Sequence, residues 1–261
     1  MGNVSTFKKS LQRAINRQEL EIVYQPKLNM ETEQVTGLEA LLRWKMEGGY
    51  TVSPDIFIPL AEKSGMITTI TFYVAEHVFQ CLWEWHMQGI DTVPVSINIS
   101  RIDLCMPEFA GRLIGLMRQY QIENQAIELE ITETFFVMDY EKIVEQLNIL
   151  RSHGISIAID DFGTGYSSLS CLRTLPVDIM KIDKVFLTDI VTDEINQGIL
   201  KGILGIAGAL ELKVVYEGVE TKAQVEYLKQ FPYKIAQGFY YAHSMCRSEL
   251  ECWLTSQADF H

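Results

Sequence analysis

Short apolar stretches with the character of strands alternate with amphipathic helical stretches along nearly the whole chain of 261 residues. Eight strands are predicted, at residues 21–28, 35–44, 95–100, 126–133, 155–161, 178–183, 212–219 and 234–241. Helical patterns separate most of them, and a further helix is predicted at residues 6–18. Strands and helices that alternate in this way form parallel sheets covered by helices, so the chain is predicted to be an α/β protein.

Polar residues interrupt seven of these apolar strands. They are Glu39, Asn98, Glu130, Asp160, Lys181, Glu217 and Gln237. An open, doubly wound sheet would spread such residues along one edge, whereas a closed barrel collects the carboxyl ends of its strands into one ring. We therefore expect an eight-stranded α/β barrel of the TIM (β/α)8 type, with a polar site at one end.

The strand at residues 155–161 ends in two adjacent carboxylates, Asp160 and Asp161. The stretch Phe162–Gly165 then breaks the strand, because its glycines permit a tight turn. Two negative charges at the end of an apolar strand repel each other, and a divalent cation would relieve that repulsion. An acidic cap on a following helix is the alternative, and this stretch alone does not decide between them.

The strand ends together offer a set of possible metal ligands that contains only oxygen donors. Its members are Glu39, Asn98, Glu130, Asp160, Asp161 and Glu217. Oxygen donors favour Mg²⁺ or Mn²⁺ over zinc, with Ca²⁺ as an inhibitory substitute, and none of the five histidines stands among these acids. More acids are present than one ion needs, which favours two ions bridged by an aspartate. Paired hard ions suit in-line attack of an activated water on a phosphodiester, with Lys181 orienting the water or stabilising the developing charge.

Composition limits the classes of partner. The formal net charge of -12 argues against binding of a nucleic-acid polymer, which needs a basic surface. A small anionic ligand is compatible with it, because bound metal ions reverse the local sign. The five cysteines are odd in number and lack CxxC spacing, which indicates reduced thiols in a cytoplasmic protein. No apolar run is long enough to span a bilayer, so no membrane segment is predicted.

Seven motifs, in this order, resemble the EAL-domain family of cyclic di-GMP phosphodiesterases. They are Glu39-Ala40-Leu41, Asn98, Glu130-Ile131-Thr132-Glu133, Asp160-Asp161-Phe162-Gly163-Thr164-Gly165, Lys181-Ile182-Asp183, Glu217-Gly218-Val219-Glu220-Thr221 and Gln237-Gly238. The resemblance implies a modified barrel whose first strand is antiparallel, and hydrolysis of cyclic di-GMP to linear pGpG with Mg²⁺ or Mn²⁺. We divide the chain into an N-terminal helical extension, residues 1–19, and an EAL barrel domain, residues 20–261.

The resemblance also implies roles for the acids. Two overlapping sets resemble the ligands of two metal ions, namely Glu39, Asn98, Glu130 and Asp160 for one ion, and Asp160, Asp161 and Glu217 for the other. Lys181 resembles the lysine beside the attacking water. We therefore expect Lys181, Glu39 and Glu217 to be catalytic.

Further roles implied by the resemblance concern the substrate and a loop. Gln25 and Arg43 match positions that contact the substrate, and Gln237 matches a glutamine near the metal ions and their water. Glu133 matches a glutamate that anchors the loop after the two aspartates. Family loops like residues 162–170 also support a homodimer interface, so a homodimer is expected.

Two departures from the family pattern and two alternative functions stay open. Tyr216 stands where a small alanine is usual and could crowd the Glu217 site, and residues 242–245 lack the usual basic residue and proline. One alternative function is a catalytically silent module that senses cyclic di-GMP or a protein, although such relatives normally lose acids from the ring. The other is a barrel phosphodiesterase for glycerol-type diesters, although those sites normally use histidines.

Overall fold

The structure of this chain is a computed structural model that describes residues 4–46, 48–132, 139–164 and 172–258. Its strands are β1 (Leu20–Asn29), β2 (Val35–Lys45), β3 (Thr51–Val52), β4 (Val95–Asn98), β5 (Ile127–Thr132), β6 (Ser156–Phe162), β7 (Ile179–Ile182), β8 (Lys213–Tyr216) and β9 (Ile235–Ala236). Its helices are α1 (Val4–Asn16), α2 (Pro54–Ser64), α3 (Ile67–Met87), α4 (Arg101–Leu104), α5 (Phe109–Gln119), α6 (Tyr140–Ser152), α8 (Glu194–Ala209), α9 (Lys222–Leu228) and α10 (Arg247–Ala258), with short 3-10 helices η1 (Asn124–Ala126) and η3 (Lys184–Phe186).

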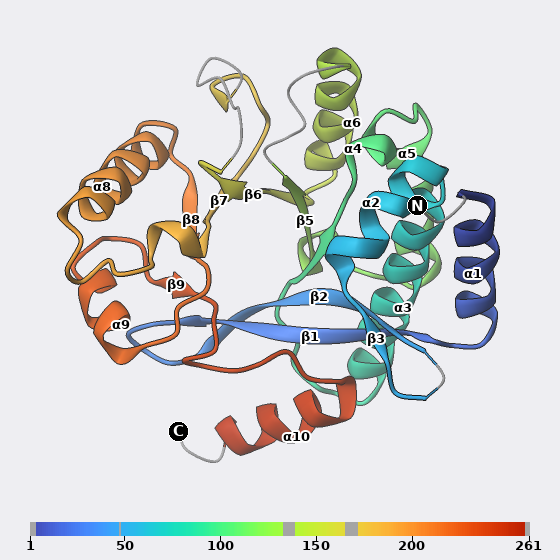
Figure 1. Ribbon diagram of the computed structural model, residues 1–261, viewed down its shortest axis with the longest axis horizontal. Helices are drawn as coiled ribbons and strands as arrows, with labels where there is room; N and C mark the ends of the chain where they lie inside the picture. The colour runs from blue at the N-terminus through green and yellow to red at the C-terminus, as the bar shows by residue number, and fades with distance from the viewer. Residues whose placement is uncertain (1–3, 47, 133–138, 165–171, 259–261) are drawn as a thin grey trace.

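Apart from β3, these strands close into a barrel with the longer helices on its outside (Figure 1). The ring runs in the order β1-β9-β8-β7-β6-β5-β4-β2, and a pairing between β1 and β2 closes it. β1 is antiparallel to both of its neighbours. The remaining pairs of the ring are parallel. The predicted barrel with an antiparallel first strand is therefore confirmed, and the open sheet is excluded.

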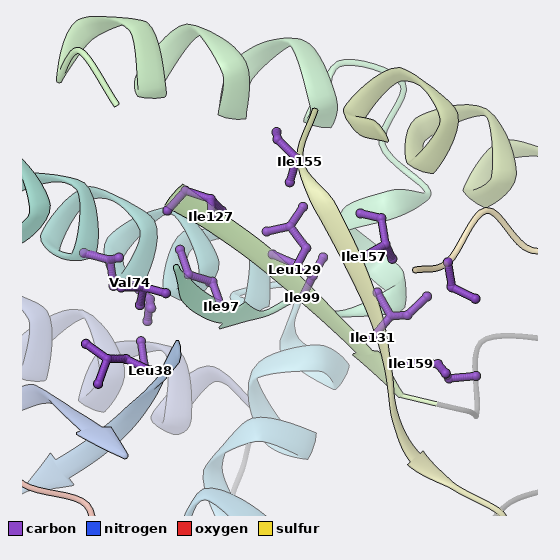
Figure 2. Close-up of a cluster of buried hydrophobic side chains, with 14 of the residues drawn as sticks. Leu38, Val74, Ile97, Ile99, Ile127, Leu129, Ile131, Ile155, Ile157 and Ile159 are labelled. Carbon is purple, nitrogen blue, oxygen red and sulfur yellow. The ribbon is translucent and has the colours of Figure 1, made fainter. Parts of the chain in front are cut away.

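Side chains on the outer face of the strands form the main core. In β5, Ile127, Leu129 and Ile131 are buried, and Leu129 is paired with Ile157 of β6. Figure 2 shows these aliphatic side chains together with others from β2, β4 and α3. Burying one such side chain stabilises the fold by roughly 1.5–3 kcal/mol. This layer holds the strands in place and leaves the alternate positions to face the interior.

The interior of the barrel has an apolar half and a polar half. The apolar half is the cluster of Ala158, Ile179, Val215 and Ile235. The polar half contains Lys27, Ser96 and Glu128. Strand alternation puts residues two positions apart on the same face. The residues that follow the four apolar residues, Ser96 and Glu128 by two positions are therefore also inward. They are the predicted site residues Asp160, Lys181, Glu217, Gln237, Asn98 and Glu130.

Some strands differ from those predicted. Only Ile235–Ala236 of the predicted strand 234–241 forms a strand, and β3 is not among the predicted strands. Just after β9, the backbone at Gly238 approaches Val219 so closely that an added Cβ would lie 2.1 Å from the Val219 carbonyl oxygen. The sequence places an edge or a bulge near Pro26, and the ladder between β1 and β2 does shift register immediately after it, between Lys27 and Leu28.

Helix α1 precedes the barrel and packs against it. Leu11 and Ala14 are fully buried, and the ring of Phe7 contacts Trp44 of β2 edge-on at 6.1 Å between centroids. α1 also contacts α2. The division of the chain at residue 19 stays a proposal. No helix in the described part of the chain combines the length and the apolar character that crossing a membrane requires.

Candidate active site

The structure gathers the acids of the strand ends into one cluster. Two groups of carboxylates could each hold a metal ion, namely Glu39, Glu130 and Asp160, and Asp160, Asp161 and Glu217. Within each group the possible ligand oxygens all lie within 4.8 Å of one another. Asp160 belongs to both groups, and a shared carboxylate is what bridges the ions in two-metal sites.

Lys181 lies in the middle of this cluster and is fully buried. Its Nζ atom lies 2.5 Å from Glu130 Oε2, 2.8 Å from Glu217 Oε1, 3.2 Å from Asp160 Oδ1 and 3.6 Å from Glu39 Oε2. An ammonium group has three N–H donors and no lone pair, so Lys181 cannot be a metal ligand in this state. Its charge offsets the repulsion among the four acids, which the buried position would otherwise make costly.

The glutamates of the cluster differ in their pKa values. Burial, followed by the charge of Glu130, raises the pKa of Glu39, and burial raises the pKa of Glu217 well above its ordinary value. Burial acts in the same direction on Glu130, but Lys181 and Lys27 outweigh it and lower the pKa of Glu130 to about 2. Its two lysine partners therefore favour the ionised form of Glu130, whereas the other two glutamates hold protons more readily.

Asp160 and Asp161 occupy the distorted end of β6. The pairing of β6 with β7 shifts register between Ile159 and Phe162, and Asp161 has a left-handed φ of 53°. This distortion interrupts the alternation of side chains, so two adjacent carboxylates reach one cluster. Burial, followed by the charges of Asp160 and Asp183, raises the pKa of Asp161 to about 6.

Amide side chains border the acids. Glu39 accepts hydrogen bonds from Asn98 Nδ2 at 3.0 Å and from Gln237 Nε2 at 2.7 Å. Gln237 Nε2 also donates to Gln25 Oε1 at 3.1 Å, while Gln237 Oε1 is buried without a hydrogen-bond partner. A buried acceptor of this kind suits a further donor such as an ordered water. Clustered carboxylate and amide oxygens are the donors that Mg²⁺ and Mn²⁺ prefer, so these residues fit such ions.

Two cavities flank Glu39, which lines both. The larger, of about 690 Å³, lies between β2 and helices α2 and α3, and its lining includes Arg43, Asn98, Asp55 and Arg101. The smaller, of about 240 Å³, has a lining that includes Gln25, Lys184, Glu217, Gln237 and Phe239. Two members of the acid cluster therefore line cavities, Glu39 both of them and Glu217 the smaller.

The atypical segment at residues 242–245 contacts both residues that are predicted to bind the substrate. Gln25 Nε2 donates to the carbonyl oxygen of Ala242 at 3.1 Å, and one Arg43 nitrogen donates to Ser244 Oγ at 3.4 Å. The structure thus places Gln25 and Arg43 at the rim of the cluster rather than among the acids.

Tyr216 does not crowd the Glu217 site. Its neighbour in β8, Val215, faces the barrel interior, whereas Tyr216 is buried in the main core outside the barrel and lies near Tyr233. Strand alternation explains why a large side chain fits here without entering the site. Glu133 and residues 165–171 lie outside the described residues, so the loop anchor and most of the predicted dimer loop stay predictions.

The sequence reasoning missed Lys27. This buried lysine contacts Glu130 from the side opposite to Lys181, with a 2.7 Å distance from its Nζ to Glu130 Oε1. The sequence does contain a signal that Lys27 faces the site. Side chains two positions apart on a strand share a face, so Lys27 lies on the same face of β1 as Gln25. Lys181 is expected to be buried because of its apolar neighbours, and the same argument applies to Lys27.

Comparison with curated proteins identifies the family. The EAL domain model matches residues 8–244 of this chain. The oxygen sensor protein DosP of Escherichia coli K12 is 35% identical over 247 residues, and the cyclic di-GMP phosphodiesterase NbdA of Pseudomonas aeruginosa is 34% identical over 248 residues. Each match covers 95% of this chain but only 31% of DosP and 32% of NbdA. The chain therefore spans about a third of the length of these relatives.

Solved structures have the same architecture. The PaMucR phosphodiesterase in complex with c-di-GMP superposes with a TM-score of 0.87 at 32% identity, over 94% of this chain and 99% of that one. The EAL domain protein from Listeria monocytogenes EGD-e superposes with a TM-score of 0.81 at 28% identity, over 98% of this chain and 99% of that one. Because the family model, these relatives and the acid cluster agree along nearly the whole chain, it belongs to the EAL-domain family of cyclic di-GMP phosphodiesterases.

Proposed function

We propose that this chain hydrolyses cyclic di-GMP to linear pGpG with the help of two divalent cations, Mg²⁺ or Mn²⁺. The observation that carries the proposal is the pair of carboxylate groups that share Asp160, one of whose members, Glu39, lines two cavities. The name of NbdA and the ligand of the PaMucR structure support the choice of cyclic di-GMP. An intact set of acids argues against a silent binding module.

The two carboxylate groups define which residues would hold the ions. Glu39, Glu130 and Asp160, together with the amide oxygen of Asn98, would hold one ion, and Asp160, Asp161 and Glu217 the other. Bound ions would supply Lewis-acid chemistry, lowering the pKa of a water and offsetting charge on the phosphodiester. Asn98 now points Nδ2 at Glu39, so its amide would turn over to present Oδ1 to an ion.

Lys181 would act on the reacting water and the phosphate. Its Nζ atom lies within 3.2 Å of oxygens on both groups of acids, so a donor stands where a water between the groups would be oriented. The same charge would stabilise the negative charge that develops on the phosphate oxygens. Gln237 would add its free Oε1 acceptor to hold a water proton.

The cavities on either side of Glu39 suit a substrate with two bases. Cyclic di-GMP is two-fold symmetric, so a scissile phosphodiester placed at the acids sends one guanine to each side. The larger cavity offers Arg43, Arg101 and Asp55 as polar partners, and the smaller offers Gln25 and the exposed ring of Phe239. Arg43 and Gln25 are thereby proposed to contact the substrate.

The proposal is tested by incubating the protein with cyclic di-GMP and following the product by chromatography, in parallel with Mg²⁺, Mn²⁺ and Ca²⁺. We expect pGpG with Mg²⁺ or Mn²⁺ and inhibition by Ca²⁺, which tolerates irregular coordination and longer ligand distances. Tight binding of cyclic di-GMP in calorimetry without any hydrolysis would support the silent module instead. Turnover of glycerol-type diesters but not of cyclic di-GMP would contradict both.

The affinity for Mn²⁺ is expected to be about tenfold weaker at pH 5 than at pH 7.5. Asp161 has a pKa raised to about 6, so a proton occupies this carboxylate below that pH and must leave before an ion can bind. The contribution of Asp161 to the affinity is therefore present well above pH 6 and is lost as the pH falls through 6. Calorimetric titration at both pH values measures the affinity for Mn²⁺. Asp161→Asn is the control, because asparagine does not gain or lose a proton in this pH range. Equal affinity at both pH values would contradict the assignment of Asp161 as a ligand.

Two further properties are proposals. A homodimer through the loop at residues 162–170 rests on the family resemblance, and light scattering at several protein concentrations tests it. A cytoplasmic location rests on the cysteines, of which Cys81, Cys105, Cys246 and Cys252 are free thiols.

A further inference from the structure

A second buried lysine lies deeper in the barrel than the acid cluster. The side chain of Lys27 comes from β1 and only 3% of the residue's surface is exposed. Its Nζ atom lies 2.6 Å from Ser96 Oγ, 2.7 Å from Glu128 Oε1 and 2.7 Å from Glu130 Oε1. Ser96 Oγ also donates to Glu128 Oε1 at 2.7 Å, which leaves the hydroxyl as an acceptor for the lysine. The ammonium therefore has one acceptor for each of its three N–H donors.

These contacts fix Lys27 in place. A buried ammonium costs several kcal/mol unless it is paired and hydrogen-bonded, and here two carboxylates and a hydroxyl meet that need. Gly37, opposite Lys27 in the β1–β2 ladder, leaves room for it, because even an added Cβ would lie at ordinary contact distance of 3.5 Å from Lys27 Cδ. With its donors all engaged, Lys27 has none left for substrate or water.

The contact with Glu130 connects Lys27 to the candidate metal site. Lys27 Nζ is bound to Glu130 Oε1, and Lys181 Nζ is bound to Glu130 Oε2. Glu130 is 1% exposed, and its carboxylate is held between two cations on opposite oxygens. Without Lys27, the carboxylate would be free to turn both oxygens toward Lys181 and away from an ion.

We propose that Lys27 is a positioning residue, which acts on the metal site by fixing the orientation of Glu130. The inference rests on the proposed function, because it assigns Glu130 to a metal ion. It differs from a purely structural ion pair in one measurable respect. A structural pair would change the stability of the fold alone, whereas a positioning residue also sets the affinity for the ion.

The test is the affinity for Mn²⁺, measured from the electron paramagnetic resonance signal of the free ion, which does not depend on catalysis. Lys27→Met is expected to weaken the affinity about 10–100-fold, the range seen when partners that orient metal ligands are removed. Glu19→Gln is the matched control, since Glu19 is a glutamate that is 9% exposed, accepts a hydrogen bond from Trp44 Nε1 and belongs to neither carboxylate group. Its affinity is expected to stay within about twofold of the unchanged chain.

Lys27→Met leaves two buried carboxylates without their cation and could prevent folding. The double variant Lys27→Met with Glu128→Leu removes one of these two carboxylates. Its affinity for Mn²⁺ still reports the effect of losing Lys27 on Glu130. Circular dichroism and melting temperature establish that each variant is folded. A folded variant without Lys27 that binds Mn²⁺ within twofold of the unchanged chain overturns the inference, as does a Glu19→Gln variant that weakens binding equally. Failure of the unchanged chain to bind Mn²⁺ would overturn both the role of Lys27 and the proposed function. Binding of Mn²⁺ without hydrolysis of cyclic di-GMP would overturn only the proposed function.

Discussion

Replacing Glu39 by alanine is expected to reduce turnover of cyclic di-GMP by about 10³-fold or more, because it removes an oxygen ligand on which one of the two ions depends. Glu39 shares the first carboxylate group with Glu130 and Asp160 and accepts hydrogen bonds from Asn98 and Gln237. The substitution therefore removes a ligand and leaves two amides without their acceptor. Initial rates at saturating Mn²⁺, together with a Mn²⁺ titration, separate a weaker affinity from a slower reaction.

Glu19→Gln provides the matched control for this change. Glu19 is also a buried glutamate, 9% exposed against 6% for Glu39, but it accepts a hydrogen bond from Trp44 Nε1 and belongs to neither carboxylate group. Its substitution is expected to leave turnover within about threefold. A folded Glu39→Ala variant that keeps more than a tenth of the rate at saturating Mn²⁺ would contradict the role given to Glu39.

Replacing Lys181 by methionine is expected to reduce turnover to a similar degree, by about 10³-fold, while the protein still binds Mn²⁺. Lys181 contacts four acids but supplies no lone pair, so its loss removes a donor to the reacting groups without removing a ligand. The acids then lose the ammonium group that contacts all four of them, and bound cations become the main source of positive charge. The melting temperature should therefore fall without metal and recover with Mn²⁺ by more than it does in the unchanged chain.

Lys45→Met is the control for Lys181→Met. Lys45 lies at the end of β2, and its side chain is 57% exposed in an ion pair with Glu21. Exposed pairs contribute little, so rate and metal affinity are expected to stay unchanged. Loss of Mn²⁺ binding in a folded Lys181→Met variant would show that Lys181 builds the metal site, and near-normal turnover would remove it from the reaction.

The fold and most of the acid cluster were predictable because strand periodicity carries both. A charged residue at an inward position of an apolar strand is costly unless something compensates it, so Glu39, Glu130 and Lys181 each indicated a common site. Convergence of such residues required closure of the sheet, and this argument chose the barrel correctly.

Other features depend on contacts between distant parts of the chain. Lys27 is stabilised by acceptors on β4 and β5, and no local pattern around Lys27 shows that Ser96 and Glu128 will be there. The need for a glycine at position 238 depends on the backbone of Val219, which approaches Gly238 only in the folded molecule. Strand alternation determines the side of β8 to which Tyr216 points. The family resemblance alone suggested that Tyr216 would crowd Glu217, and the structure shows that it does not.

The reversed direction of β1 determines at which end of the barrel, relative to the candidate active site, a segment upstream of β1 would lie. Because β1 runs against the other strands, it begins at the end of the barrel where they finish, and Leu20 is paired with Trp44 near the end of β2. α1 joins it there and contacts α2, whose residues Pro54 and Phe57 line the larger cavity. A domain fused ahead of α1 would therefore be connected to the larger cavity through two packed helices.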